Sequence, residues 1–277
     1  MRPLPRFLQM RLALAHALDL PPHHLLKHLP ELGSVTPEIT RIACGHAPLA
    51  GRRAVQISDL HLDRYKPFHD HVVADIAGLK PDWIFVTGDL LTVSDGLPHL
   101  FRFLGNLREI VPVYMTLGNH DHHSGVPVDR FTAWADRHKV SLLINQTVFV
   151  PVPSGELGIV GLDDPSLHRA DLRCIPPAGP GRFTVVLAHA PNVLDHLDAG
   201  RATALILCGH THGGQWRIPL VPPFWLPYGC SGRTEGFYHR NGHRLYVNRG
   251  LGWSFLPIRI RCRPEILAID WIDEPSS

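Results

Sequence analysis

Five apolar runs in the sequence each end in side chains that can bind a metal ion. In one of them, ALILCGHTHGGQW at residues 204–216, the apolar stretch leads directly into two histidines that stand one residue apart, His210 and His212. The corresponding residues after the other four runs are Asp59 and His61, Asp89, Asn119 with His120 and Asp121, and His189. Taken alone, such an aspartate or asparagine usually forms a turn, and a lone histidine is usually an ordinary polar group. Together they indicate one shared site, because crowded carboxylates need positive charge beside them.

The chemistry of these side chains selects the kind of ion. Carboxylate, amide and imidazole groups without a thiolate suit Mn, Fe, Zn or Mg, whereas a zinc finger or an iron–sulfur cluster would need cysteines. Cys208 adjoins the site only in sequence, and we predict that it packs in the core. The candidate ligands outnumber what one ion needs, so we predict two divalent ions held by a shared carboxylate.

The apolar runs have the length and the β-branched residues of strands. They are RAVQIS, DWIFVT, VPVYMTL, FTVVLA, ALILC and RLYVN, and segments with helical spacing at residues 69–79 and 97–110 separate the first three. Apolar strands that alternate with helices predict an α/β fold with a largely parallel sheet covered on both faces. Residues 141–162 alternate instead and turn at residues 153–155, which predicts an antiparallel hairpin. Two packed sheets accommodate both patterns, with the ligands beyond the carboxyl ends of the strands.

Composition favours one large globular domain that follows a short extension. The chain has 277 residues, of which 44% are apolar and 19% charged, and its net charge is +2. We predict an N-terminal helical extension over residues 1–48, with an amphipathic helix at residues 5–20, and a single domain over residues 49–277. The sequence has no basic stripe with interleaved aromatic residues, which argues against a nucleic-acid partner.

Cysteines and apolar segments bear on the location of the protein. The five cysteines form no CxxC pair, which argues against a disulfide framework and favours a reducing compartment. No run has the length of a membrane span, and the N-terminal segment makes a poor signal peptide. We therefore expect a cytoplasmic protein. The amphipathic helix and an apolar, proline-rich loop at residues 218–228 leave two options open, docking on the protein itself or peripheral contact with the inner membrane.

Five ordered motifs resemble the signature blocks of the calcineurin-like metallophosphoesterases. They are DLHL at 59–62, GDLL at 88–91, GNHD at 118–121, AHAP at 188–191 and GHTHGG at 209–214. The resemblance implies a four-layer αββα sandwich with a binuclear metal site at the strand ends. It also implies one ligand set for each ion: Asp59, His61 and His212 for the first, Asn119, His189 and His210 for the second, and Asp89 as the bridge.

The same resemblance implies how the site would work. His120 stands where the family has a catalytic histidine that is not a ligand, which stabilises charge on the phosphoryl group or protonates the leaving oxygen. Asp121 is expected to orient the ring of His120. The expected nucleophile is a hydroxide that bridges the two ions, for which we expect manganese and leave iron, zinc and magnesium open.

The C-terminal half resembles one branch of the family more narrowly. The segments GHTHGGQWRIPLVPPFWLPYG, LYVNRGLGWS and RPEILAID are similar to the membrane-associated bacterial branch, which includes the UDP-2,3-diacylglucosamine pyrophosphate hydrolases of lipid A biosynthesis. We therefore expect a pyrophosphatase that acts on a lipid nucleotide or on another phosphorylated small molecule. The residues expected to bind the substrate are Arg233, Asn248, Arg249, Phe224 and Trp225, since a guanidinium can bind phosphate oxygens and an apolar loop can hold acyl chains.

Two other functions remain open from the sequence. One is a soluble phosphodiesterase or phosphatase that acts on nucleotides or phosphoproteins, for which residues 1–30 would be dispensable. The other is a scaffold that binds partners without catalysis. A scaffold would be expected to have lost some of the metal ligands, and this chain has all of them.

Overall fold

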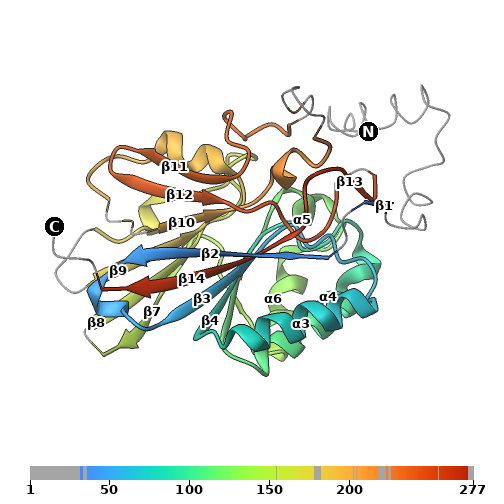
Figure 1. The fold of residues 1–277 in the computed structure, drawn as a ribbon, viewed down its shortest axis with the longest axis horizontal. Coiled ribbons are helices and arrows are strands. Elements are labelled where there is room, and N and C mark those ends of the chain that lie inside the picture. The colour runs from blue at the N-terminus through green and yellow to red at the C-terminus, as the bar shows by residue number, and fades with distance from the viewer. Residues whose placement is uncertain are drawn as a thin grey trace.

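Two six-stranded sheets lie face to face in the structure (Figure 1). The structure is a computed structural model, and it describes residues 32–33, 36–153, 155–177, 182–201, 203, 205–217, 223, 226–254 and 256–273. In spatial order, the strands of the first sheet are β2 (Glu38–Gly45), β14 (Glu265–Ile272), β3 (Arg53–Ile57), β4 (Trp83–Thr87), β5 (Val113–Thr116) and β6 (Ser141–Leu142). Those of the second sheet are β11 (Gly236–Arg240), β12 (His243–Val247), β10 (Leu205–Cys208), β9 (Arg182–Leu187), β8 (Gly155–Gly161) and β7 (Gln146–Val152). Two short strands, β1 (Leu32–Gly33) and β13 (Ile258–Arg259), form a separate parallel pair.

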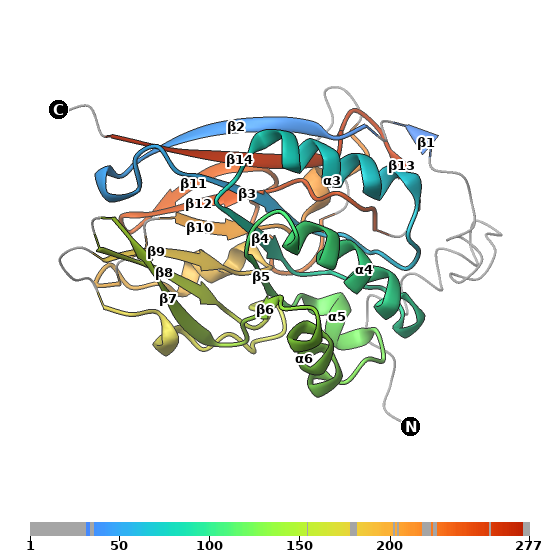
Figure 2. The same ribbon diagram turned by 90° about the horizontal axis from the view of Figure 1, so that it is seen from below.

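Three helices cover the outer face of the first sheet (Figure 2). They are α3 (Pro67–Leu79), α4 (Leu97–Arg108) and α6 (Val128–Arg137). α3 begins with a proline, whose fixed φ suits the first turn of a helix. Its buried side chains Val72, Ile76 and Leu79 lie on one face of the helix and pack in the same core as Ile84 of β4. The helices predicted at residues 69–79 and 97–110 are thereby confirmed.

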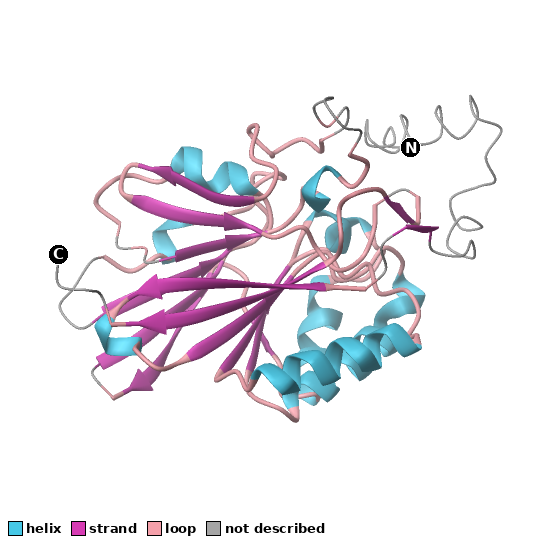
Figure 3. Cartoon of the chain, in the orientation of Figure 1, coloured by secondary structure: helices cyan, strands magenta, loops and turns pink. Residues whose placement is uncertain are grey.

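A second core fills the space between the two sheets. It joins Phe85 and Leu267 of the first sheet to Ile159 and Val185 of the second. The outer face of the second sheet carries a third core, which is covered by the 3₁₀ turns η3 (Leu172–Cys174) and η4 (Pro191–His196) (Figure 3). The predicted four-layer αββα sandwich is therefore confirmed, and its fourth layer, within the described ranges, consists of 3₁₀ turns.

The pairing of the strands confirms part of the sequence analysis and adds to it. The predicted hairpin is present, because β7 and β8 pair antiparallel. β14 was not predicted from the sequence, and it runs antiparallel to β3 and parallel to β2. β2 lies within the predicted extension 1–48, whereas residues 1–31 and most of the loop 218–228 lie outside the described residues. Among the helices that are described, none has the length and apolar character needed to cross a membrane.

Parallel strands bring the candidate ligands to one end of the sandwich. β3, β4 and β5 are parallel neighbours in the first sheet, and β8, β9, β10 and β12 are parallel neighbours in the second. The buried side-chain amide of Gln56 connects the two sheets near these ends. It donates one hydrogen bond to Thr87 Oγ1 (2.8 Å) and another to the carbonyl of Cys208 (3.0 Å). The loops after β3, β4, β5, β9 and β10 therefore lie around a common point.

Candidate metal centre

Backbone hydrogen bonds hold the loops after the strands against one another. Asp59 donates its N–H to the carbonyl of Gly88 (3.1 Å), and His61 donates to the carbonyl of Asp89 (3.0 Å). In the second sheet, Gly209 donates to the carbonyl of His189 (3.0 Å). The segments that carry Asp59, His61, Asp89 and His189 are thus held beside segments from neighbouring strands.

The backbone of the candidate ligands is strained. The φ angles lie in the left-handed region at Asp59 (51°), His61 (42°), Asp89 (51°), His210 (74°) and His212 (50°). Residues with a Cβ atom rarely adopt this conformation, which costs about 1–3 kcal/mol each and tends to occur at functional sites. The surrounding core therefore maintains five unfavourable backbone conformations in order to turn these side chains toward one point.

Glycines allow the loops to approach this closely. A Cβ atom on Gly209 would overlap both Ser58 Oγ and Asp59 Oδ2. A Cβ atom on Gly118 would overlap Asp89 Oδ1 and would lie 2.8 Å from Cδ2 of His189. Only glycine fits at these two positions, because the space that a larger residue needs is filled by the candidate ligands themselves.

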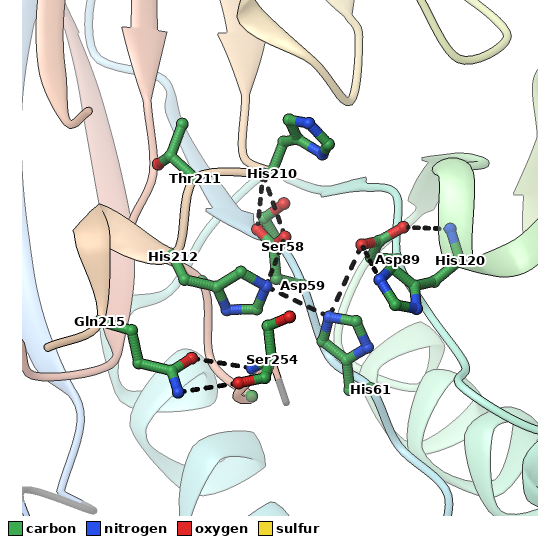
Figure 4. Close-up of polar contacts among 12 residues, drawn as sticks. Ser58, Asp59, His61, Asp89, His120, His210, Thr211, His212, Gln215 and Ser254 are labelled. Carbon is green, nitrogen blue, oxygen red and sulfur yellow. Dashed lines mark hydrogen bonds and ion pairs between the residues drawn. The ribbon is translucent and has the colours of Figure 1, made fainter. Parts of the chain in front are cut away.

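Two groups of side chains have the geometry to hold a metal ion, and Figure 4 shows all four members of the first group. Their ligand atoms lie within 4.8 Å of one another, and the groups are Asp59, His61, Asp89 and His212, and Asp89, His189 and His210. In the first group, His212 Nε2 lies 3.3 Å from His61 Nε2 and 3.4 Å from Asp59 Oδ1. In the second group, His210 Nδ1 lies 3.0 Å from His189 Nε2.

Asp89 belongs to both groups, and each of its oxygens faces a different one. Oδ2 lies 3.6 Å from His61 Nε2, and Oδ1 lies 3.2 Å from His189 Nε2. A carboxylate in this position can hold two ions about 3.5–4 Å apart. The predicted bridging geometry is thus available at Asp89.

Backbone carbonyls determine which ring nitrogen of His189, and which of His210, faces the centre. His189 Nδ1 lies 2.9 Å from the carbonyl of Thr87, and His210 Nε2 lies 2.7 Å from the carbonyl of Tyr228. A carbonyl only accepts, so in both rings the nitrogen beside it must carry the proton. In the neutral form of each ring, the other nitrogen has the lone pair and faces the ligand group, as in a histidine that binds a metal.

Burial and neighbouring charges shift the pKa values of the ligands in different directions. Burial raises the pKa of Asp59 to about 6, and it lowers the pKa of both His210 and His212, which favours their neutral, metal-binding form. Burial also opposes the charge on Asp89, but the positive charges of His189, His120 and His61 outweigh it and hold the pKa of Asp89 well below its usual range. The charge of Asp89 in turn raises the pKa of His189 well above its usual range, despite burial. Divalent cations would supply the positive charge that the buried carboxylates of Asp59 and Asp89 need.

The donor atoms themselves fit divalent cations. Asn119 begins the short helix α5 (Asn119–His123), and its Oδ1 is buried without a hydrogen-bond partner, as expected of an oxygen that awaits a ligand. All seven predicted ligands offer oxygen or imidazole nitrogen, a set that suits Mn, Fe, Zn or Mg. The thiol of Cys208 packs in the core beneath the second sheet, as predicted.

His120 and Asp121 follow Asn119 on α5 but are held differently. The backbone N–H of His120 donates to Asp89 Oδ1 (2.8 Å), and its Nε2 lies 4.0 Å from Asp89 Oδ2. The ring of His120 therefore lies at the edge of the centre. Asp121 accepts backbone N–H groups from Leu90 and Leu91 at Oδ1 (2.9 Å each) and from Gly118 at Oδ2 (2.8 Å). Its carboxylate thus ties the loop after β4 to the start of α5, which positions His120 through the main chain.

The residues expected to bind substrate make contacts within the protein where they are described. Arg233 forms a two-pronged ion pair with Asp195 (2.7 and 3.0 Å), and Arg249 lies 3.0 Å from Glu38. Asn248 is fully buried and accepts the N–H of Gly250. Phe224 and Trp225 lie outside the described residues. Contact of any of these residues with substrate stays a prediction.

Arg259 is a residue near the centre that sequence reasoning missed. Arg259 is 5% exposed, and its guanidinium donates to the carbonyls of Arg249 (3.0 Å), Gly250 (3.2 Å), Gly252 (2.8 Å) and His212 (3.5 Å). It thereby holds the loop after β12 against His212, which is a member of the first ligand group. In the sequence it is one of several arginines in RIRCR, at residues 259–263, and nothing in the pattern distinguishes it from a surface cation.

A sandwich of two sheets with oxygen and imidazole ligands at the strand ends is the architecture of a metal-dependent phosphoesterase. The family model described as calcineurin-like phosphoesterase matches residues 52–214, more than half of the chain. The chain therefore belongs to the calcineurin-like phosphoesterases and is a metal-dependent hydrolase of phosphoric esters.

Relatives from bacteria support this membership. The chain is 33% identical over 228 residues to the uncharacterized metallophosphoesterase YkuE of Bacillus subtilis (strain 168), with 78% of this chain and 77% of YkuE covered. It is 29% identical to the phosphodiesterase YaeI of Escherichia coli (strain K12), with 78% and 80% covered. It is also 29% identical to the UDP-2,3-diacylglucosamine pyrophosphatase LpxG of Chlamydia trachomatis, with 83% and 86% covered.

Proposed function

We propose that this enzyme hydrolyses a phosphodiester or phosphoanhydride at a centre of two divalent cations. The observation that carries the proposal is Asp89, whose two oxygens face the two ligand groups separately. We assign Asp59, His61 and His212 to the first ion, Asn119, His189 and His210 to the second, and Asp89 to both. When bound, such a pair of ions supplies a nucleophile at neutral pH and neutralises charge on the phosphoryl oxygens, and manganese is the metal we propose.

The protein's own contribution to the reaction centres on His120. Its ring lies at the edge of the centre and its side chain is 11% exposed, so a leaving oxygen can reach it. We assign to His120 the donation of a proton, or of a hydrogen bond, to that oxygen. Asp121 is a positioning residue, because its hydrogen bonds to Gly118, Leu90 and Leu91 fix the segment that carries His120 relative to Asp89.

For the substrate, we propose UDP-2,3-diacylglucosamine, whose phosphoanhydride would be cleaved by water to UMP and 2,3-diacylglucosamine 1-phosphate. The proposal is supported by the likeness to LpxG and by the apolar, proline-rich segment at residues 218–228. Peripheral contact with the inner membrane belongs to the same proposal. The likeness to YaeI favours a second candidate, a phosphodiesterase with a soluble substrate.

Activity and metal content of the full chain test the proposal together. We expect the manganese-loaded protein to contain about two ions and to hydrolyse both bis(p-nitrophenyl) phosphate and the lipid nucleotide. Asp89→Asn should lose metal from both positions together with activity, whereas Asp129→Asn, on the exposed face of α6, should change neither. Full activity with a single ion would overturn the two-metal proposal. Activity on the soluble ester alone would remove the lipid nucleotide and leave the second candidate.

A further inference from the structure

A further strand end at the candidate metal centre carries two aspartates that the proposed reaction does not use. β8 runs parallel to β9, and Leu162, the residue after β8, donates its N–H to the carbonyl of Leu187 at the end of β9 (2.9 Å). Asp163 and Asp164 come next in the chain, whereas His189 comes two residues after β9. Both aspartates therefore leave the second sheet at the edge where the metal ligands gather.

The two aspartates are paired differently. Asp163 has a cationic partner, because its Oδ2 accepts from Arg169 Nε (3.0 Å). Asp164 is fully buried, and its Oδ1 accepts the hydroxyl of Ser166 (2.5 Å) and the backbone N–H of Leu167 (2.7 Å). Its Oδ2 has no hydrogen-bond partner among the described residues. A buried carboxylate that is bonded only to neutral groups is unfavourable unless positive charge lies near it.

The turn that holds Asp164 packs close to His210, a ligand of the second group. A Cβ atom on Gly229 would lie 2.8 Å from Cβ of Ser166 and 3.5 Å from Nε2 of His210, so the turn and the ring lie on either side of one glycine. Burial lowers the pKa of His210, and the charge of Asp164 opposes this effect. Burial opposes the charge on His189 as well, and Asp164 is one of the carboxylates that raise the pKa of that ring instead. The charge of Asp164 therefore acts on both imidazoles of the second group.

A second oxygen without a partner lies beside the same turn. Asn192 donates from Nδ2 to the carbonyl of Pro165 (3.3 Å), and its backbone N–H donates to the carbonyl of Gly229 (2.9 Å). The residue is 7% exposed, and its Oδ1 has no hydrogen-bond partner within the described ranges. The region beside His210 thus has an excess of buried oxygen acceptors, which suits a cation and the water around it.

We infer that Asp164 is a positioning residue for the second ion, and that its carboxylate helps to retain this ion beside His189 and His210. Of the ligands proposed above, the first ion has a carboxylate of its own in Asp59, and the second has only its share of Asp89. Amide and imidazole ligands are neutral when they bind a metal, so the second ion lacks negative charge, which Asp164 supplies without being a ligand. The inference rests on the proposed centre of two ions and adds to it a residue outside the ligand set.

Asp164→Asn separates the charge of the side chain from its structural role. The amide keeps an oxygen that can accept from Ser166 and Leu167, so the turn should still form, but the amide has no charge. In a manganese titration of the full chain after removal of metal, we expect the variant to bind one ion as the wild type does and the other about 10- to 100-fold more weakly. In a His210→Ala background, which lacks a ligand of the second ion, Asp164→Asn should not change the affinity for the remaining ion. Unchanged affinity for both ions in the single variant would overturn the inference, as would a loss of affinity in the His210→Ala background.

Thermal unfolding with and without metal gives a second measurement. Manganese should raise the Tm of Asp164→Asn by less than it raises the Tm of the wild type, because a weaker site stabilises the folded chain less. The control is Asp270→Asn, which removes an ion pair with Arg53 (2.5 Å) at the opposite end of β3 from the metal ligands. This control should lower Tm equally in manganese and in a chelator. The same behaviour in Asp164→Asn would mean that Asp164 only holds its own turn.

Metal binding is measured without substrate, so this inference and the proposed function can fail separately. If Asp164→Asn weakens one ion as expected but the wild type hydrolyses neither bis(p-nitrophenyl) phosphate nor the lipid nucleotide, the proposed hydrolysis fails and the inference stands. If the wild type binds two ions and hydrolyses an ester while Asp164→Asn binds both ions equally well, the inference fails and the proposed function stands.

Discussion

At the scale of single residues, a substitution of His120 tests catalysis without affecting metal binding. We predict that His120→Asn lowers kcat about 10²- to 10⁴-fold without changing metal content, because the ring is near Asp89 but is not in either ligand group. If His120 protonates the leaving oxygen, an alkyl ester should be affected more than a p-nitrophenyl ester, whose leaving group needs no proton. Steady-state kinetics on both esters and metal analysis of both proteins measure this. An equal loss on both esters would contradict the assignment of a general acid.

Asp163 provides a prediction about pH. Burial opposes its charge, but hydrogen bonds from His122 (2.5 Å), from a backbone N–H and from Arg169 (3.0 Å) outweigh burial and lower its pKa. A lowered carboxylate pKa stabilises the fold above the unfolded pKa, and this stabilisation disappears as the pH falls through the folded pKa. Asp163→Asn should therefore destabilise the protein at neutral pH by about 1–3 kcal/mol and much less near about pH 3. Urea denaturation of both proteins in the presence of a chelator checks this, and a difference that does not depend on pH would argue against it.

At the scale of elements, the loop after β10 can pack closely only because residue 209 is a glycine, which has no side chain. Gly209→Ala would place a methyl group against Ser58 and Asp59, and overpacking of this kind costs about 1–3 kcal/mol. We expect a lower Tm and a weaker affinity for metal. Gly78→Ala is the matched control: Gly78 lies in α3 with open space around it, and alanine there should stabilise the helix by about 0.5–1 kcal/mol. Calorimetric unfolding and a metal titration would detect both effects, and a neutral Gly209→Ala would show that the loop can move.

The loop after β12 is held in place by hydrogen bonds from Arg259. Arg259→Met keeps much of the side-chain volume but leaves several buried carbonyls without a donor, which should cost about 3 kcal/mol. Because one of these carbonyls belongs to His212, metal affinity should fall as well. Arg261→Met, on an exposed residue of the same segment, should change neither property. Chemical denaturation and metal titration of the two variants distinguish a buried hydrogen-bonding cation from a general effect of charge.

At the scale of the whole molecule, removal of metal should lower stability. The centre joins loops from both sheets, so ions that bind only the folded chain stabilise the whole sandwich. At a free metal concentration about 100-fold above Kd, one such site contributes about 2.7 kcal/mol. We therefore expect a chelator to lower Tm and manganese to restore it, as measured by calorimetry. A Tm that does not respond to either addition would mean that the centre contributes nothing to folding.

The sequence predicts much of this architecture because its signals are local. Each apolar run carries its ligands directly after it, so the strands and the residues from Asp59 to His212 that gather at their ends could be inferred together. The left-handed backbone at Asp59 or His210 could not be inferred from the sequence, because contacts between distant loops impose it. The same holds for Arg259, whose contact with His212 joins residues 47 positions apart in the chain.

The position of β14 has a consequence for how the protein is made. Residues 265–272 lie between β2 and β3, which are encoded more than two hundred residues earlier. Until residues 265–272 have left the ribosome, β3 keeps an open edge that can capture strands of other nascent chains. Ribosome-bound fragments that end before residue 265 should therefore recruit chaperones, and fragments that also expose residues 265–272 should not.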